Sequence, residues 1–212
     1  KYGHWVQCLP EYEKEYGNFV KNLNRMKNGW LPGGKKDESI ERLKEASFSI
    51  GKGSCETFRV EKGEKLFTDC NFRIQNIAPE IHGLTGIRMG LGEAISEGVH
   101  VNFTLDEDSY VLVGYFNSKG VEWLQVPDLE TNTHADDRGG LAVVFRNALK
   151  ADGCPPVNIH AFRYEKGTHE MYLGTGGFVI VGVVPVSEKL HARDAGLEGE
   201  GLETLDWLYE EN

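Results

Sequence analysis

The sequence predicts a mainly β protein: an antiparallel β-sandwich, of the jelly-roll or galactose-binding-like type, with a short helical N-terminal extension. Three observations support this fold class. Downstream of Ser47 the apolar residues recur with a period of two, candidate strands follow one another at intervals of about ten residues, and glycine-bearing turns separate them. A parallel α/β fold would need helices between the strands, and the sequence indicates none there.

The first 46 residues are predicted to be helical. Apolar side chains between residues 11 and 30 follow the three-and-four spacing of an amphipathic helix, which Pro10 can begin and Gly29 can end. Asp37 can cap a second short helix that ends near Ala46. We therefore expect a helical extension or connector ahead of the sandwich.

Residues 47–186 are predicted to form the sandwich itself. The segment 99–105 alternates apolar and polar residues, as in a strand with one buried and one solvated face. Acidic residues at 106–108 then predict a turn into the segment 109–116, so the two segments together predict a hairpin. Further strands are expected at 56–60, 84–91, 121–126, 141–149, 157–164, 170–173 and 178–184.

Residues 187–212 form an acidic, glycine-punctuated tail. It is either a flexible exit or a terminal strand or turn docked by Trp207. Docking is favoured, because an exposed Trp-Leu-Tyr cluster would form a hydrophobic surface patch prone to association. At the other end, the chain starts at Lys1 without the pattern of a signal peptide, which suggests a processed protein or an excised fragment.

The charge balance argues against two classes of partner. With 33 acidic and 23 basic residues, the formal net charge is −10, whereas nucleic acids and anionic membranes attract clustered Lys and Arg. The longest apolar run, at 178–184, is far shorter than the roughly 20 residues that span a bilayer. We expect neither nucleic acid nor membrane as a partner.

Four scattered cysteines show no Cys-x-x-Cys pair, so zinc-ribbon and thioredoxin-like sites are not expected. We expect mostly free, buried thiols. Cys55 and Cys70 are the one pair that a short hairpin could bring together as a disulfide.

The segment 121–140 holds the densest group of side chains suited to a binding site. Sugar recognition needs an aromatic ring to stack on a pyranose, together with carboxylates, amides and guanidinium groups that pair with hydroxyls. The candidate ligand-binding residues are Tyr115, Trp123, Asn132, His134, Asp136, Asp137, Arg138 and His160. The competing interpretations are core packing for Trp123, a solvated loop for residues 132–138, and a buried, hydrogen-bonded histidine at His160.

Catalytic and metal sites are weaker interpretations of the same residues. A glycoside hydrolase or polysaccharide lyase would need two of Asp136, Asp137, His134 and His160 to converge, yet adjacent acids in a strand point to opposite sides. Oxygen ligands near His134 would suit Ca²⁺ better than zinc, but calcium-loop spacing is absent, so no cofactor is expected, with Ca²⁺ as the alternative.

Several motifs carry a resemblance to a known group of proteins. They are Val-Gly-Tyr-Phe at 113–116, Trp-Leu-Gln-Val-Pro at 123–127, His-Ala-Asp-Asp-Arg-Gly-Gly at 134–140, Val-Asn-Ile-His-Ala-Phe at 157–162 and Gly-Gly-Phe-Val-Ile-Val-Gly-Val-Val at 176–184. This third of the chain resembles the β-sandwich accessory modules of large polysaccharide-processing proteins in Bacteroidetes-type bacteria. The resemblance implies a carbohydrate ligand, an upstream catalytic domain, and a secreted, periplasmic or cell-surface location. It carries over no catalytic residue.

From the sequence we therefore expect a non-catalytic carbohydrate-binding or structural accessory domain associated with polysaccharide degradation. The alternatives are the hydrolase or lyase already described, and a purely structural module whose loop packs on a partner domain.

Overall fold

The computed structural model describes residues 17–21, 42–116, 143–191 and 193–197. The chain divides into two compact units, one made of residues 1–38 with 200–212 and the other of residues 39–199. In the first unit residues 17–21 are helical, which agrees with the amphipathic helix predicted over residues 11–30. The second unit holds all the described strands.

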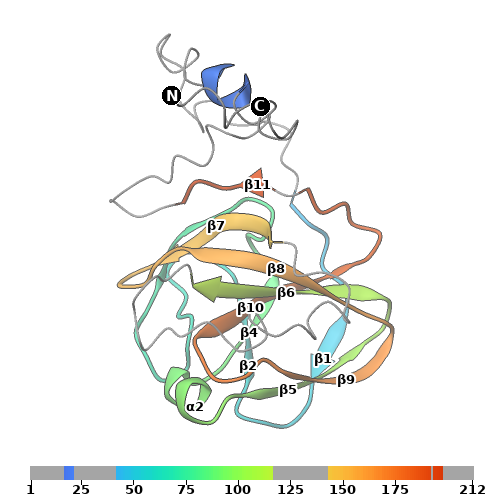
Figure 1. The fold of residues 1–212 in the computed structure, drawn as a ribbon. Helices are drawn as coiled ribbons and strands as arrows, with labels where there is room; N and C mark the ends of the chain where they lie inside the picture. The colour runs from blue at the N-terminus through green and yellow to red at the C-terminus, as the bar shows by residue number, and fades with distance from the viewer. Residues whose placement is uncertain (1–16, 22–41, 117–142, 192, 198–212) are drawn as a thin grey trace, which may run out of the picture. The chain divides into compact units, whose positions relative to one another are not determined.

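The second unit is a mainly antiparallel β-sandwich, as the sequence predicts (Figure 1). Its larger sheet has the order β11 (Arg193–Asp194), β7 (Val143–Ala151), β8 (Val157–Tyr164), β6 (Ser109–Phe116), β10 (Phe178–Pro185), β4 (Thr85–Arg88) and β2 (Glu56–Arg59), and β3 (Ile74–Ile77) also pairs with β7. The smaller sheet has the order β1 (Phe48–Ile50), β5 (His100–Leu105) and β9 (Gly167–Tyr172). Among the described pairs, β11 with β7 is parallel and the others are antiparallel.

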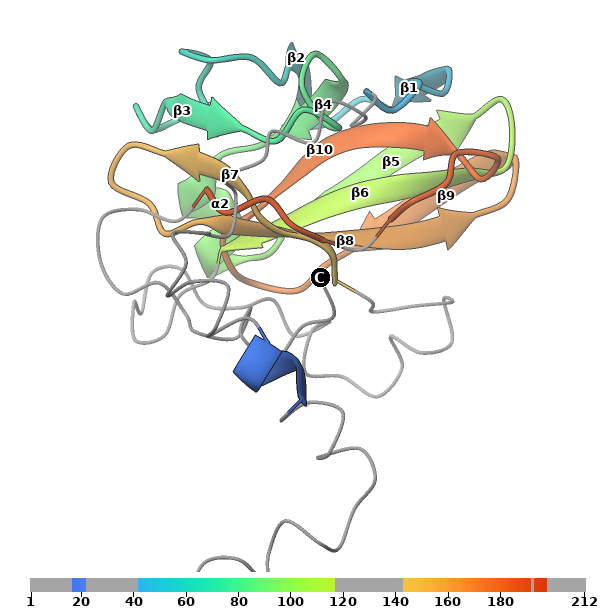
Figure 2. The same ribbon diagram turned by 90° about the horizontal axis from the view of Figure 1, so that it is seen from above.

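The central strands of the larger sheet, β8, β6 and β10, are buried on both faces. Along β6, Val111 and Val113 face a cluster shared with the smaller sheet, whereas Leu112 and Phe116 face a second cluster on the opposite side. That second side is covered by β2, β3 and the segment between them, and Figure 2 shows β3 lying beside β7 where the sheet curls back. Because side chains alternate across a strand, an apolar run such as that of β10 fills both clusters at once.

The predicted hairpin between residues 99–105 and 109–116 is wrong. The two strands form, but β5 pairs with β1 and β9, whereas β6 pairs with β8 and β10. The turn between them connects the two sheets and is stabilised by hydrogen bonds from residues distant in the sequence. Val186 N–H donates to Asp108 O at 3.0 Å, and Lys166 N–H donates to Asp108 Oδ1 at 2.9 Å. The alternation of apolar and polar residues identified the two strands but does not determine which strands they pair with.

The segment 84–91 is not one continuous strand. Strand β4 ends at Arg88, and the short helix α2 (Leu91–Ser96) follows. Asp69 caps this helix from a distant loop, because its carboxylate accepts the N–H groups of Leu91 at 2.7 Å and Gly92 at 2.8 Å. Burial alone would raise the pKa of Asp69, but these bonds and one from the Cys70 thiol outweigh it and lower that pKa.

The predicted second helix does not extend to Ala46. Described residues 42–47 are not helical and lie along the sandwich, where Leu43 N–H donates to Glu80 O at 3.0 Å and Ala46 N–H to Val183 O at 2.9 Å. At the other end, β11 pairs with β7, and Arg193 forms two hydrogen bonds to the buried carboxylate of Glu80. At residues 42–47, hydrogen bonds to a distant turn and to β10 therefore replaced those of a local helix.

Three cysteines lie among the described residues, and all three are free thiols. Cys55 and Cys70 therefore do not form the one disulfide that the sequence allowed. Burial raises the pKa of Cys154 to about 12 and, with the hydrogen bond to Asp69, raises that of Cys70 to about 11. Both thiols are protonated at neutral pH. The expectation of free thiols is confirmed for these three cysteines, but only Cys154 is buried, and Cys55 and Cys70 are partly exposed.

Candidate functional site

Most of the predicted ligand-binding residues lie outside the described residues. Strand β6 ends at Phe116 and β7 begins at Val143, and both pair with β8, Phe116 opposite Val157 and Val143 opposite His160. The predicted residues that fall between these two strands are Trp123, Asn132, His134, Asp136, Asp137 and Arg138, together with the expected strand 121–126.

The structure brings together the two predicted residues that it does describe. Tyr115 lies on β6 and His160 on β8, and their rings pack edge to face with centroids 4.9 Å apart and an interplanar angle of 87°. Both side chains face the interior between the two sheets, and each residue is only 2% exposed. In this structure the pair is part of the core, and a glycan in solvent cannot stack on Tyr115.

A bulge in β7 lies close to this pair. Between Phe145 and Leu149 the strand advances four residues while β8 advances two, from Ile159 to Val157. The bulge contains Asn147, which is buried and has a φ of 47°, a left-handed conformation that asparagine tolerates better than most residues. Its N–H donates to Asn158 Oδ1 at 2.9 Å, and Asn158 pairs with Tyr115 across the sheet.

The bulge also binds the C-terminal segment of the second unit. The carbonyl oxygen of Arg146 accepts Ala195 N–H at 2.9 Å, and that of Asn147 accepts Leu197 N–H at 3.1 Å. The irregular part of β7 therefore anchors residues 193–197 to the sheet. This gives the bulge a structural role in holding two segments together.

Sequence reasoning missed a second group of polar residues, on the solvent face of the smaller sheet. His100, Asn102 and Thr104 alternate with the buried residues of β5, and Thr168, Glu170 and Tyr172 do the same on β9. The alternation of apolar and polar residues in the segment 99–105 already predicted a solvent-exposed face for β5. It could not predict that Tyr172 and His100 lie directly opposite each other, because that depends on the pairing of β5 with β9.

The described ranges contain no candidate metal site and no candidate membrane-spanning helix. No group of three or more His, Cys, Asp or Glu side chains there is arranged to hold a metal ion. Over the same ranges, no helix has the length and apolar character needed to cross a membrane.

Comparison with known proteins finds similarity among solved structures. No protein-family model matches the chain, and no curated protein matches it. The chain is similar to part of a GH138 enzyme targeting pectin rhamnogalacturonan II, at 27% identity and a TM-score of 0.67, over 97% of this chain and 23% of that enzyme. A β-glucuronidase from glycoside hydrolase family 2 matches at 13% identity and a TM-score of 0.44, over 66% of this chain and 14% of that enzyme.

The match to the GH138 enzyme agrees with the class of protein that the fold defines, a mainly antiparallel β-sandwich. The chain spans less than a quarter of the length of the GH138 enzyme. The likeness is therefore to one part of a much larger glycoside hydrolase.

Proposed function

We propose that this chain is a non-catalytic carbohydrate-binding or structural accessory domain associated with polysaccharide degradation. The observation that carries the proposal is the match to the GH138 enzyme, in which nearly the whole of this chain corresponds to 23% of that protein. A domain that accounts for about a quarter of a much longer enzyme is consistent with an accessory domain of a multidomain protein. The partners in this proposal are a carbohydrate ligand and an upstream catalytic domain, at a secreted, periplasmic or cell-surface location.

The buried position of His160 argues against its use in catalysis. A general acid or base must reach the proton that it transfers, and His160, the one described candidate of the catalytic alternative, is 2% exposed and packed against Tyr115. The other candidates of that alternative, His134, Asp136 and Asp137, lie outside the described residues. Contact of the 132–138 segment and Trp123 with a glycan remains part of the proposal.

The function is tested with the whole 212-residue chain in two assays run side by side. Affinity electrophoresis through gels containing soluble polysaccharides measures binding, and release of reducing ends measures hydrolysis. We expect retardation by at least one polysaccharide, with weak affinity in the range of about mM to μM, and no release of reducing ends. Shallow sites of this kind act through several copies or a linked domain.

Variants separate binding by the predicted loop from binding elsewhere. Trp123→Ala and Asp137→Ala should reduce retardation if the loop contacts the glycan, whereas Thr57→Ala, an exposed residue of β2, serves as the matched control. Release of reducing ends that is lost in Asp137→Ala would show the chain to be an enzyme. Absence of retardation in every polysaccharide would refute carbohydrate binding.

A further inference from the structure

The solvent face of the three-stranded sheet carries the features of a carbohydrate subsite. We propose that Tyr172, His100, Glu170 and Asn102 on this face bind an uncharged, hydroxyl-rich oligosaccharide. The inference rests on the proposed carbohydrate-binding function, but it assigns the contact to residues of described strands and not to those of the predicted loop.

Tyr172 is the central observation. In the described ranges, the large hydrophobic residues that are exposed are Tyr172, at 42%, and Val20, at 38%, so Tyr172 is the exposed aromatic residue among them. The imidazole of His100 stacks against its ring, with centroids 4.5 Å apart and an interplanar angle of 25°. Because His100 covers one face of the ring, the proposed stacking on a sugar uses the other face, and a ring held on a strand does so at little cost in conformational entropy.

The position of the ring is fixed by its surroundings. Gly98, just before β5, has a φ of 77°, and a Cβ atom there would lie 2.7 Å from Tyr172 Cε2 and 2.8 Å from Tyr172 Oη. The ring therefore lies against bare backbone, where only glycine fits. His100, which stacks on the Tyr172 ring, also lies close to Glu170, with 2.7 Å between His100 Nδ1 and Glu170 Oε1. The imidazole, carboxylate and phenol therefore form one continuous group.

Hydrogen-bonding groups extend from this aromatic stack along the sheet. Asn102 pairs with Glu170 across the two strands, and the next outward pair, Thr104 with Thr168, shares a hydrogen bond between hydroxyls at 3.0 Å. Outward side chains on neighbouring strands form a grid of roughly 5 by 7 Å. Amide, carboxylate and hydroxyl groups at that spacing offer both donors and acceptors to sugar hydroxyls.

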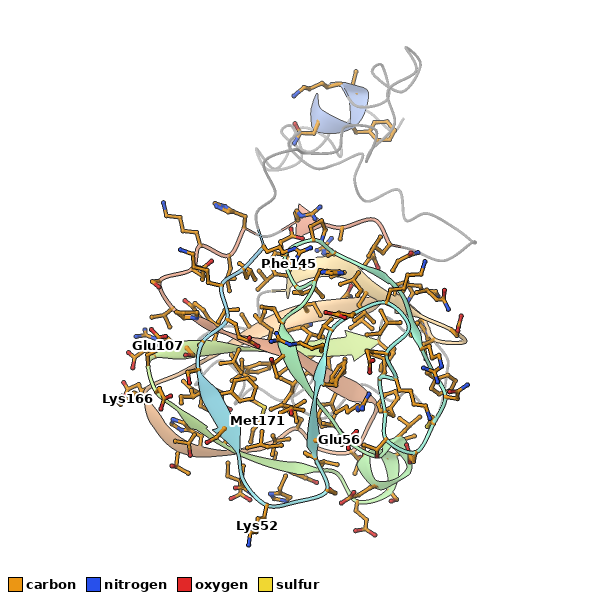
Figure 3. All side chains as sticks on the ribbon, turned by 180° about the vertical axis from the view of Figure 1, so that it is seen from behind. Lys52, Glu56, Glu107, Phe145, Lys166 and Met171 are labelled. Atoms are coloured by element: carbon orange, nitrogen blue, oxygen red, sulfur yellow. The ribbon has the colours of Figure 1, made fainter. Side chains whose placement is uncertain are left out.

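The charge of the face selects the class of glycan. None of the six outward positions of β5 and β9 is a lysine or arginine, and the one carboxylate, Glu170, has His100 as its partner. Recognition of carboxylate-rich chains uses arginine and lysine donors. Lys52 lies in the turn after β1 and Lys166 in the turn before β9, so neither takes one of the six outward positions (Figure 3). The face therefore complements a neutral glycan better than an acidic one.

The test is a two-dimensional amide NMR titration of the full chain. The probes are cellohexaose, xylohexaose and mannohexaose as neutral ligands, and hexagalacturonate as an acidic one. We expect saturable shifts of the β5 and β9 amides with at least one neutral probe. Tyr172→Ala should weaken that affinity by about tenfold, while Tyr172→Phe, which keeps the ring, should stay within about threefold.

A matched pair of charge-removing variants tests the polar contacts. Glu170→Gln should weaken binding by about threefold or more, because it removes the negative charge beside His100 and replaces a strong carboxylate acceptor with a weaker amide oxygen. Glu107→Gln, at an exposed position in the turn after β5, should bind as the wild type does. The amide spectrum of each variant shows directly whether it is folded.

The possible outcomes separate this inference from the proposed function. Neutral-probe binding that is unchanged in Tyr172→Ala would overturn the subsite and leave carbohydrate binding standing. Binding of hexagalacturonate alone would overturn the charge argument and with it the subsite. If no probe binds, the subsite fails, while carbohydrate binding itself is decided by the retardation assay with polysaccharides.

Discussion

The ion pair between Glu80 and Arg193 offers the sharpest test of how the second unit is held together. Arg193 on β11 donates to both carboxylate oxygens of Glu80, including a bond of 2.9 Å from Nη2 to Oε2. The backbone carbonyl of Glu80 also accepts Leu43 N–H, so this residue joins the entering and leaving segments of the sandwich. The perturbation is Arg193→Met, which leaves the carboxylate in place without its partner.

The size of the effect follows from burial. The Glu80 side chain is 8% exposed and that of Arg193 is 30% exposed. Breaking a fully buried pair costs about 3–5 kcal/mol, because an uncompensated charge remains inside. Partial exposure of Arg193 lets water reach the carboxylate, so we expect a loss of about 2–3 kcal/mol of unfolding free energy. The double variant Glu80→Met with Arg193→Met removes the orphaned charge and should recover more than half of that loss.

Urea unfolding followed by far-ultraviolet circular dichroism measures these differences, with hydrogen exchange locating the loosened segment. Arg163→Met is the matched control, since Arg163 and Asp108 are 3.8 Å apart and 55% and 44% exposed. It should cost no more than about 0.5 kcal/mol. An Arg193→Met variant as stable as Arg163→Met, or a double variant less stable than Arg193→Met, would refute the reasoning.

Three further predictions concern other parts of the second unit. Phe103→Ala should lower the unfolding free energy by about 3–5 kcal/mol in urea titrations, because Phe103 is 2% exposed in the cluster between the sheets. Gly98→Ala should cost more than about 1 kcal/mol by the same measurement, given the positive φ and the contact with the Tyr172 ring. Because the pKa of Asp69 is lowered in the folded state, its contribution to stability is present above its unfolded pKa and lost as the pH falls through the folded value. The stability difference between the wild type and Asp69→Asn should therefore shrink from about pH 6 to about pH 2, and a constant difference would contradict the capping role.

The sequence was a good guide to which residues form strands. The expected strands at 56–60, 157–164 and 178–184 correspond to β2, β8 and β10 within a residue at each end, because alternation and apolar runs are local properties of the chain. Where the sequence failed, a distant group had changed the local outcome. Asp69 caps α2 from 22 residues away, and hydrogen bonds from Leu43 and Ala46 to the sandwich displaced the expected helix.

The candidate site was less predictable. Tyr115 and His160 have residue types suited to sugar binding, and only the neighbourhood of His160 alternates in sequence, whereas Tyr115 lies in the nearly continuous apolar run 111–116. Their burial follows from the central position of β6 and β8 in a sheet that is covered on both faces. The exposed Tyr172 lies instead on β9, an edge strand of the smaller sheet, and sheet membership decides which aromatic residue meets solvent.

By itself, the sequence determined the fold class, the acidic character of the chain and most strand segments, since composition and periodicity are fixed by the order of the residues. Only the tertiary structure decided that β5 and β6 belong to different sheets, that Tyr115 packs on His160 inside, and that Tyr172 and His100 stack outside. The physical reason is that strand pairing is non-local. A period of two says that a strand has two faces, and only its neighbours determine which face is covered.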